Sequence, residues 1–290
     1  MHPAGSIIVF TALSGLGFGM LFWLGLGHFT PTYWTGFVFF AVAYALSVGG
    51  LLASTFHLGH PERALKAFTQ WRSSWLSREG WLACITLGVM GLYAAALVFA
   101  GAWLAPLGWL GAVGSLVTVY ATSMIYAQLK TVPRWNHWTT NVLFLGLSLG
   151  GGALLTGAVW PAIVLLLSTA AVQVYAWRAG DQRLAESGTD MATATGLGGI
   201  GAVTAFEPPH TGGNYLTHEM VFVVGRKHAR KLQNIALILG FALPVLLLML
   251  PSSHLLALLA IGLHLAGLFV LRWLFFAQAE HVVGLYYGKR

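Results

Sequence analysis

The chain has 290 residues, of which 57% are apolar and only 8% are charged. This composition excludes an ordinary soluble domain, in which about 25% of the residues are charged. The formal net charge is +7, but the basic residues lie in separate short segments and form no continuous stripe, which argues against a nucleic-acid partner.

The charged side chains occupy four short stretches, and long charge-free blocks lie between them. These blocks are residues 1–61, 80–129, 135–177 and 232–271. A hydrocarbon core about 30 Å thick needs roughly 20 apolar residues for each helical crossing, so each block is long enough for two crossings joined by a hairpin. Two crossings return the chain to the side it left. The pattern therefore predicts that every charged stretch and both termini lie on one side.

The predicted fold is an all-α integral membrane protein with eight transmembrane helices in one bundle, formed by residues 1–290 as a single domain. In chain order, the helices are expected at 6–27, 34–57, 80–101, 106–127, 138–157, 161–178, 233–251 and 255–277. All 15 Lys and Arg residues lie on the charged side. The positive-inside rule places that side, with both termini, in the cytoplasm, and the expected location is the bacterial inner membrane.

Two segments on the charged side are longer than a connection requires. Residues 58–79 are rich in Trp, Arg and Lys, which favours a helix lying along the membrane surface. Residues 179–232 have too few large apolar residues to form a core of their own, and we expect a partner protein to order them. This loop matches G-x-G-x-x-G at 196–201, but a dinucleotide site would require a preceding strand and a following helix, so we dismiss the motif.

His57 ends the second predicted helix and Glu79 opens the third, so both lie at one depth on the charged side. The structural interpretation is an interfacial histidine and a carboxylate in the first turn of a helix that Ser77 caps. In the functional interpretation, an imidazole and a carboxylate at one membrane depth exchange protons with a redox ligand such as a quinone. The spacing by itself leaves both interpretations open.

Two further ionisable residues lie within the last predicted helix. His264 is deep in the bilayer, where an ionisable group is a functional candidate. A bis-histidine haem would need a second histidine at matching depth, which the pattern does not supply, so a hydrogen-bonded structural role is favoured. Arg272 lies near the helix end and is expected to extend its side chain to the charged surface.

Several segments resemble the membrane anchor subunits of the dimethyl sulfoxide reductase type. They are Met1-His2-Pro3-Ala4, the run from Thr11 to Gly17, the run from Ser54 to Pro61, and Leu76-Ser77-Arg78-Glu79. The loop tract from Ala194 through Glu207-Pro208-Pro209-His210 to Lys231 is similar to the version in sulfite-oxidising relatives.

The resemblance implies a haem-free anchor that holds an iron–sulfur subunit and a molybdopterin catalytic subunit on the membrane. The molybdopterin and the iron–sulfur clusters would belong to these partners, and the anchor would exchange electrons with ubiquinone or menaquinone. The family's quinol-binding histidine and glutamate match His57 and Glu79. Trp71 and Trp75 are weaker candidates to wall the quinone pocket, and Arg72 and Arg78 to polarise a quinone carbonyl.

Glu207, His210 and Arg226, in the loop tract, are expected to contact the iron–sulfur subunit. Partners on the cytoplasmic side favour sulfite oxidation coupled to quinone reduction over a reductase, whose catalytic subunits are exported. Three alternatives stay open: the anchor of a dimethyl sulfoxide reductase oxidising menaquinol, a haem b cytochrome subunit, and a secondary transporter.

Overall fold

The computed structural model describes residues 1–58, 60–207, 210–221, 228–251 and 253–287, apart from the side chains of His57 and Pro61. All regular secondary structure in these residues is helical, and eight spans are long and apolar enough to cross a membrane. The predicted all-α class and the number of helices are confirmed. Helices are the expected solution because lipid offers the backbone no hydrogen-bond partners, and a helix satisfies its N–H and C=O groups internally.

The eight spans follow the chain as four hairpins. They are α1 (Gly5–Leu26) and α2 (Tyr33–Ala53), α3 (Trp75–Ala100) and α4 (Ala105–Ala127), α5 (Trp138–Leu155) and α6 (Val159–Gly180), and the composite span α9 (Ala229–Leu237), η5 (Ile238–Ala242) and α10 (Leu243–Leu248) with α11 (His254–Ala277). Most boundaries agree with prediction within about three residues.

The start of α3 differs from the prediction in a way that matters for the site. The helix begins at Trp75 instead of residue 80, and Ser74 precedes it as the N-cap without a side-chain bond. Ser77 therefore lies inside the helix and does not cap it. Glu79 is in the second turn, not the first. The predicted start is wrong because it treats Arg78 and Glu79 as extramembrane residues, although both continue the helix.

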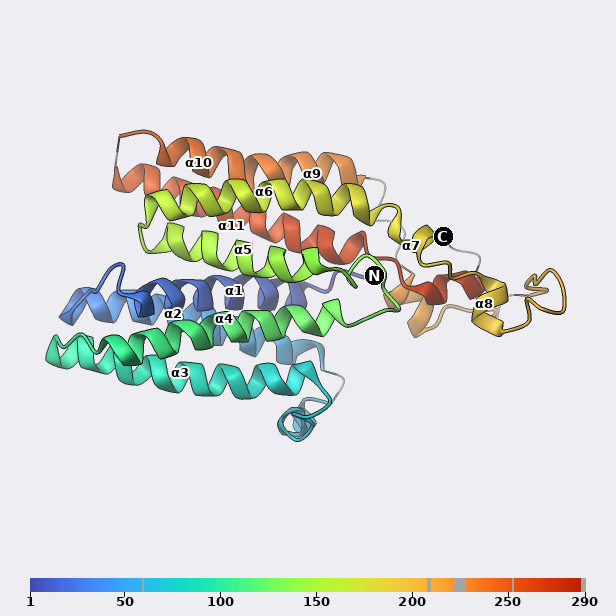
Figure 1. Ribbon diagram of the computed structural model, residues 1–290, viewed down its shortest axis with the longest axis horizontal. Helices are drawn as coiled ribbons and strands as arrows, with labels where there is room; N and C mark the ends of the chain where they lie inside the picture. The colour runs from blue at the N-terminus through green and yellow to red at the C-terminus, as the bar shows by residue number, and fades with distance from the viewer. Residues whose placement is uncertain (59, 208–209, 222–227, 252, 288–290) are drawn as a thin grey trace.

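The spans form two groups, with α1–α4 in one and α5, α6, α9, α10 and α11 in the other (Figure 1). Helix α1 joins the groups, because it packs against α2 and α4 on one side and against α5 and α11 on the other. Gly17 lies directly against Ser47 of α2, and Gly19 lies against the backbone of Ser148 in α5. A Cβ atom at either glycine would collide with these neighbours, so small residues set the close approach of the helices, as expected in lipid.

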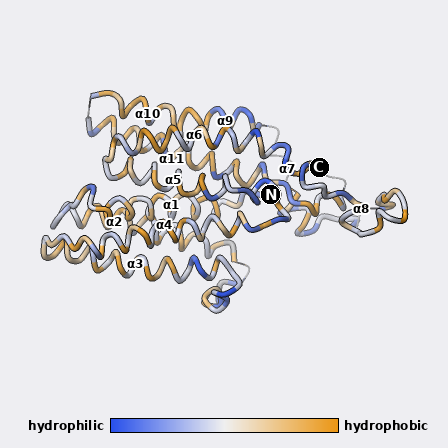
Figure 2. The backbone as a smooth tube through the Cα atoms, in the orientation of Figure 1, coloured by the Kyte–Doolittle hydropathy of each residue, from blue (hydrophilic) through white to orange (hydrophobic). Residues whose placement is uncertain are grey.

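Polar and charged residues gather at one end of the bundle, while the spans themselves are mostly apolar (Figure 2). The N label lies at this charged end (Figure 1), and the amino group of Met1 donates to the Ala279 carbonyl at 2.7 Å, just after α11. At the opposite end, α1 and α3 stop at Gly27 and Gly101, whose φ angles of 75° and 61° suit glycine at a helix C-terminus. The described charged residues gather at one end, as the sequence predicts. The side of the membrane that this end and the two termini occupy stays a prediction.

Two extramembrane segments lie at the charged end. The 3₁₀ helix η2 (Pro61–Phe68) is seen end-on in Figure 1, so its axis runs across the spans, as expected for a surface helix, although it covers only part of 58–79. The long loop contains α7 (Arg183–Glu186), α8 (Met191–Thr195) and the π-turn η3 (Leu216–Met220).

The loop packs against the ends of its own chain. The His2 amide donates to the Glu219 carbonyl at 2.7 Å, and the Asn214 side chain donates to the Tyr287 hydroxyl at 3.3 Å, in η6 (Val282–Tyr287). The sequence predicts that a partner orders this loop; the described part already has intrachain contacts that contribute to its order.

Candidate functional site

Glu79 is a buried carboxylate between α3 and α4 near the charged end of the bundle. Its side chain is only 3% exposed, and its Oε1 atom accepts a hydrogen bond of 2.5 Å from the Thr122 hydroxyl. Carboxylates are almost never fully buried without partners, and in membrane spans such groups commonly mark functional sites. The structure therefore strengthens Glu79 as a candidate while removing the helix-capping explanation.

Ser77 provides an unused polar group in the same part of α3. Its side chain is buried, and its hydroxyl has no hydrogen-bond partner among the described residues. A buried polar atom without a partner is unusual and calls for an explanation such as a ligand. Ser77 and Glu79 are thus two buried polar side chains near the start of α3, and their spacing of two directs them to different sides of the helix.

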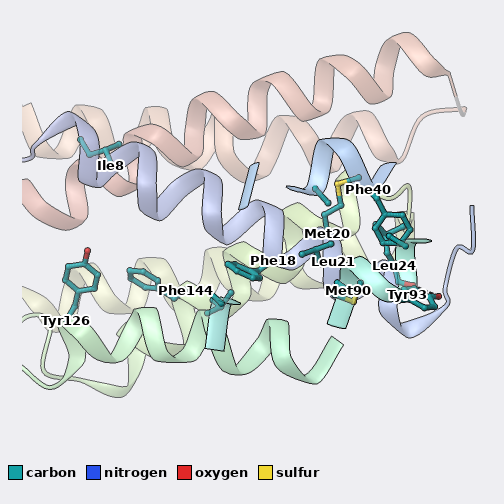
Figure 3. Packing of buried hydrophobic residues seen from close by; sticks show 14 of the residues in the cluster. Ile8, Phe18, Met20, Leu21, Leu24, Phe40, Met90, Tyr93, Tyr126 and Phe144 are labelled. Atoms are coloured by element: carbon teal, nitrogen blue, oxygen red, sulfur yellow. Dashed lines mark hydrogen bonds between the residues drawn. The ribbon is translucent and has the colours of Figure 1, made fainter. Parts of the chain in front are cut away.

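Tyr126 connects the surroundings of Glu79 to the second group of helices. It lies one turn beyond Thr122 on α4, within electrostatic range of both Glu79 and Arg272. Its ring packs against Phe144 of α5 with centroids 5.6 Å apart, and Figure 3 shows both rings at one end of the buried cluster. Further aromatic contacts to Trp135, Phe275 and Phe276 hold the phenol in place.

Arg272 does not extend to the surface as predicted. It is 3% exposed, and its guanidinium carbon lies 3.8 Å from the centroid of the Phe144 ring. The prediction is wrong because it considers only the distance to the helix end; α11 turns this side chain towards α5, where the ring face attracts the cation. Thr122 and Tyr126 are the residues that the sequence analysis did not single out. Their spacing of four, which places two side chains on one face of a helix, was the available signal. For Arg272, the signal of an inward position was its place five residues before the end of an apolar span.

His57 ends the short 3₁₀ turn η1 (Ser54–His57), which continues α2 at the charged end. This agrees with its predicted position in the chain. Its side chain lies outside the described part of the structure, so its relation to the Glu79 carboxylate stays a prediction.

Trp71, Arg72, Trp75 and Arg78 form a separate cluster at the surface. The Arg78 guanidinium stacks on Trp75 at 4.4 Å and donates to the carbonyl oxygens of Trp71 and Arg72 at 2.9 and 2.7 Å. Arg72 lies over the Trp71 ring at 5.4 Å. The structure thus brings these four residues together with one another, and none of these contacts includes Glu79.

The three predicted partner-binding residues lie in the long loop. Glu207 is exposed, the His210 ring stacks on Tyr287 with centroids 6.3 Å apart, and Arg226 lies outside the described residues. The same loop exposes two large apolar side chains, Ile200 at 86% and Phe206 at 99%. Both lie in the extramembrane loop beyond the ends of the spans, so the two side chains are candidate contacts for a protein.

His264 has a structural hydrogen bond, as predicted. It is buried, and its Nδ1 atom donates to the Gly240 carbonyl at 2.7 Å. Gly240 lies in the π-helical turn η5, and Pro244, four residues later, has no N–H for an α-helical bond to the Gly240 carbonyl. The histidine supplies that donor from the neighbouring helix.

Comparisons with known proteins agree with this architecture. Residues 1–176 match the family described as DMSO reductase anchor subunit (DmsC). A sulfite dehydrogenase subunit of Allochromatium vinosum is 34% identical over 328 aligned positions, which cover 99% of each chain. No solved structure matches. A family match over more than half of the chain and a relative aligned from end to end lead to one conclusion: this chain belongs to the family of dimethyl sulfoxide reductase membrane anchor subunits.

Proposed function

We propose that this anchor of a molybdenum oxidoreductase is also the subunit at which the complex exchanges electrons with the quinone pool. The observation that carries the proposal is Glu79, a buried carboxylate at the charged end of the spans, bonded to Thr122. The A. vinosum relative, a sulfite dehydrogenase subunit, supports sulfite as the substrate of the complex. The match to the reductase family keeps a menaquinol-oxidising reductase as the second candidate.

The residues around Glu79 fit a quinone headgroup. A quinone supplies two-electron chemistry that takes up or releases two protons. Glu79 can hold or release a proton at its carboxylate, and Thr122 fixes the orientation of that group through its hydroxyl. We propose His57, at the end of the adjacent span, as a second proton-exchanging group.

The surface cluster has a supporting role in this proposal. Because Arg78 stacks on Trp75 and binds two carbonyl groups before α3, it holds residues 71–78 against the helix start. We propose that Trp71, Arg72, Trp75 and Arg78 wall the approach to Glu79 from the membrane surface.

We also propose that the long loop binds the iron–sulfur subunit through the tract 194–231, including Glu207, His210 and Arg226. Ile200 and Phe206 support this assignment, since large apolar side chains exposed to water are unfavourable unless a partner covers them. Docking there would bring an electron donor to the end of the bundle that contains Glu79, and electron transfer requires a short distance.

The test is quinone turnover by the assembled complex after Glu79→Gln and His57→Ala. General acid–base groups typically contribute about 100-fold or more, so we expect each substitution to reduce quinone turnover by about that factor. Reduction of an artificial dye by the catalytic subunit should stay unchanged, because that reaction does not pass through the anchor.

Glu62→Gln is the matched control. Glu62 is an exposed carboxylate at the same end of the bundle and pairs with His60 at the surface, so its loss should leave quinone turnover intact. If the Glu79 and His57 variants assemble with normal quinone kinetics, these residues are structural and the quinone site lies elsewhere.

A further inference from the structure

A cavity of about 40 Å³ lies at the charged end between α5, α6 and α11. Its lining includes Arg134 and Trp135 from the segment before α5, Gln173 and Trp177 from α6, and Arg272 and Gln278 at the end of α11. By this measure the space holds about three water molecules. Neither Glu79 nor Thr122 lines it, so it is distinct from the site proposed around Glu79.

Two arginines line this cavity, and each has one N–H donor without a partner among the described residues. The Nε atoms of Arg134 and Arg272 are both buried and have no hydrogen-bond partner among the described residues. The Phe144 ring covers one face of the Arg272 guanidinium. The ring face attracts the cation, but it does not accept hydrogen bonds from the N–H groups in the guanidinium plane. The Nε–H group of Arg272 therefore still lacks an acceptor.

Arg134 has a counter-charge, and Arg272 has none among the residues that line the cavity. Asp181 accepts from Arg134 at 2.5 Å, but this carboxylate is largely exposed, and none of the residues lining the cavity is acidic. His137, between two lining segments, adds no third positive charge near pH 7, because burial and the charge of Arg183 lower its pKa. A buried guanidinium without a counter-charge is energetically costly. A bound anion would lower this cost for Arg272.

The depth of the cavity matches that of lipid headgroups. Arg272 lies five residues before the end of α11, which is about 7.5 Å along a helix, and Arg134 precedes α5. Basic pockets between membrane helices at this level bind the phosphate groups of anionic lipids.

We propose that Arg134 and Arg272 form a binding site for a phosphate group, supplied by an anionic phospholipid or by free phosphate. The planar guanidinium fork is suited to two phosphate oxygens at once. The amides of Gln173 and Gln278 supply further donors from the facing helices.

The first test measures phospholipid and phosphate retained by the detergent-purified complex after gel filtration. We expect about one phosphate-containing ligand per anchor chain beyond the weakly bound lipid, and a loss of most of it in Arg134→Gln and Arg272→Gln. Arg178→Gln is the control, because Arg178 is an exposed cation in the last turn of α6 outside the cavity. An equal loss in this control would show nonspecific surface binding and overturn the proposal.

The second test needs only the wild-type complex, so it remains valid if an arginine variant does not assemble. After delipidation, a rise in melting temperature of several degrees with phosphatidylglycerol, but not with phosphatidylcholine or inorganic phosphate, would identify a lipid phosphate. A comparable rise with inorganic phosphate, relative to chloride at equal ionic strength, would identify a free anion. If neither phosphate source raises the melting temperature above its control, the cavity holds water and the proposal is wrong.

Discussion

At the scale of single residues, the neighbouring charged residues Arg78 and Glu79 lie in opposite environments, one at the surface and one buried. Arg78 and Glu79 follow one another in α3, and consecutive helical residues point about 100° apart. Arg78 therefore lies at the surface and holds the preceding segment, while Glu79 faces α4 and bonds to Thr122. A sequence pattern that treats both as the charged start of a helix cannot separate these roles.

His264 shows how a buried polar residue can be explained by the backbone. Replacing it with Leu removes the donor to Gly240 and leaves a buried carbonyl unsatisfied, which costs about 1–3 kcal/mol. We therefore expect His264→Leu to lower the melting temperature of the complex while quinone turnover in the assembled protein is retained.

His254→Leu, an exposed site at the far end of α11, serves as the stability control for that variant. If His264 were instead a haem ligand, the wild-type anchor would show Soret absorption in its visible spectrum, and His264→Leu would abolish that absorption.

At the scale of elements, the structure changes the picture of the long loop. Its short helices contact the N- and C-terminal segments through Glu219 and Tyr287, so the loop presents a surface and not merely a flexible connection. Ile200 and Phe206 are the large apolar groups of that surface with the greatest exposure.

We expect Ile200→Asp and Phe206→Asp to weaken binding of the iron–sulfur subunit by about 30-fold each, the effect of losing a strong interface contact. The measurement is the fraction of catalytic and iron–sulfur subunits that stays with washed membranes. Ala185→Asp in α7 adds the same charge at another exposed position and should leave retention unchanged. Normal retention in both loop variants would place the docking surface elsewhere.

At the scale of the whole molecule, the charge distribution predicts the orientation in the membrane. The described charged residues lie at the end of the bundle where Met1 contacts Ala279 (Figures 1 and 2), and the positive-inside rule predicts that basic loops stay in the cytoplasm. Partners docked on the long loop would then lie in the cytoplasm, which fits sulfite oxidation there.

A single cysteine at Ser187 tests this orientation in a Cys84→Ser background. Ser187 is exposed and avoids neighbouring Gly188, whose φ of 63° disfavours other residues. We expect a membrane-impermeant maleimide to label it in inverted vesicles and not in intact cells. Labelling from the outside would reverse the orientation and move the partners with it.

The sequence by itself determined the class, the number of spans and the common end of the charges, because lipid imposes a length and an apolar composition on each crossing. It also proposed Glu79 as a candidate. Only the tertiary structure decided that Thr122 lies beside that carboxylate with Tyr126 beyond it, and that Arg272 turns inward onto Phe144. The hydropathy of a residue depends on its type alone. Its burial and its hydrogen-bond partners depend on which helices pack together and on the rotation of each helix about its axis, which are set by packing across the whole bundle.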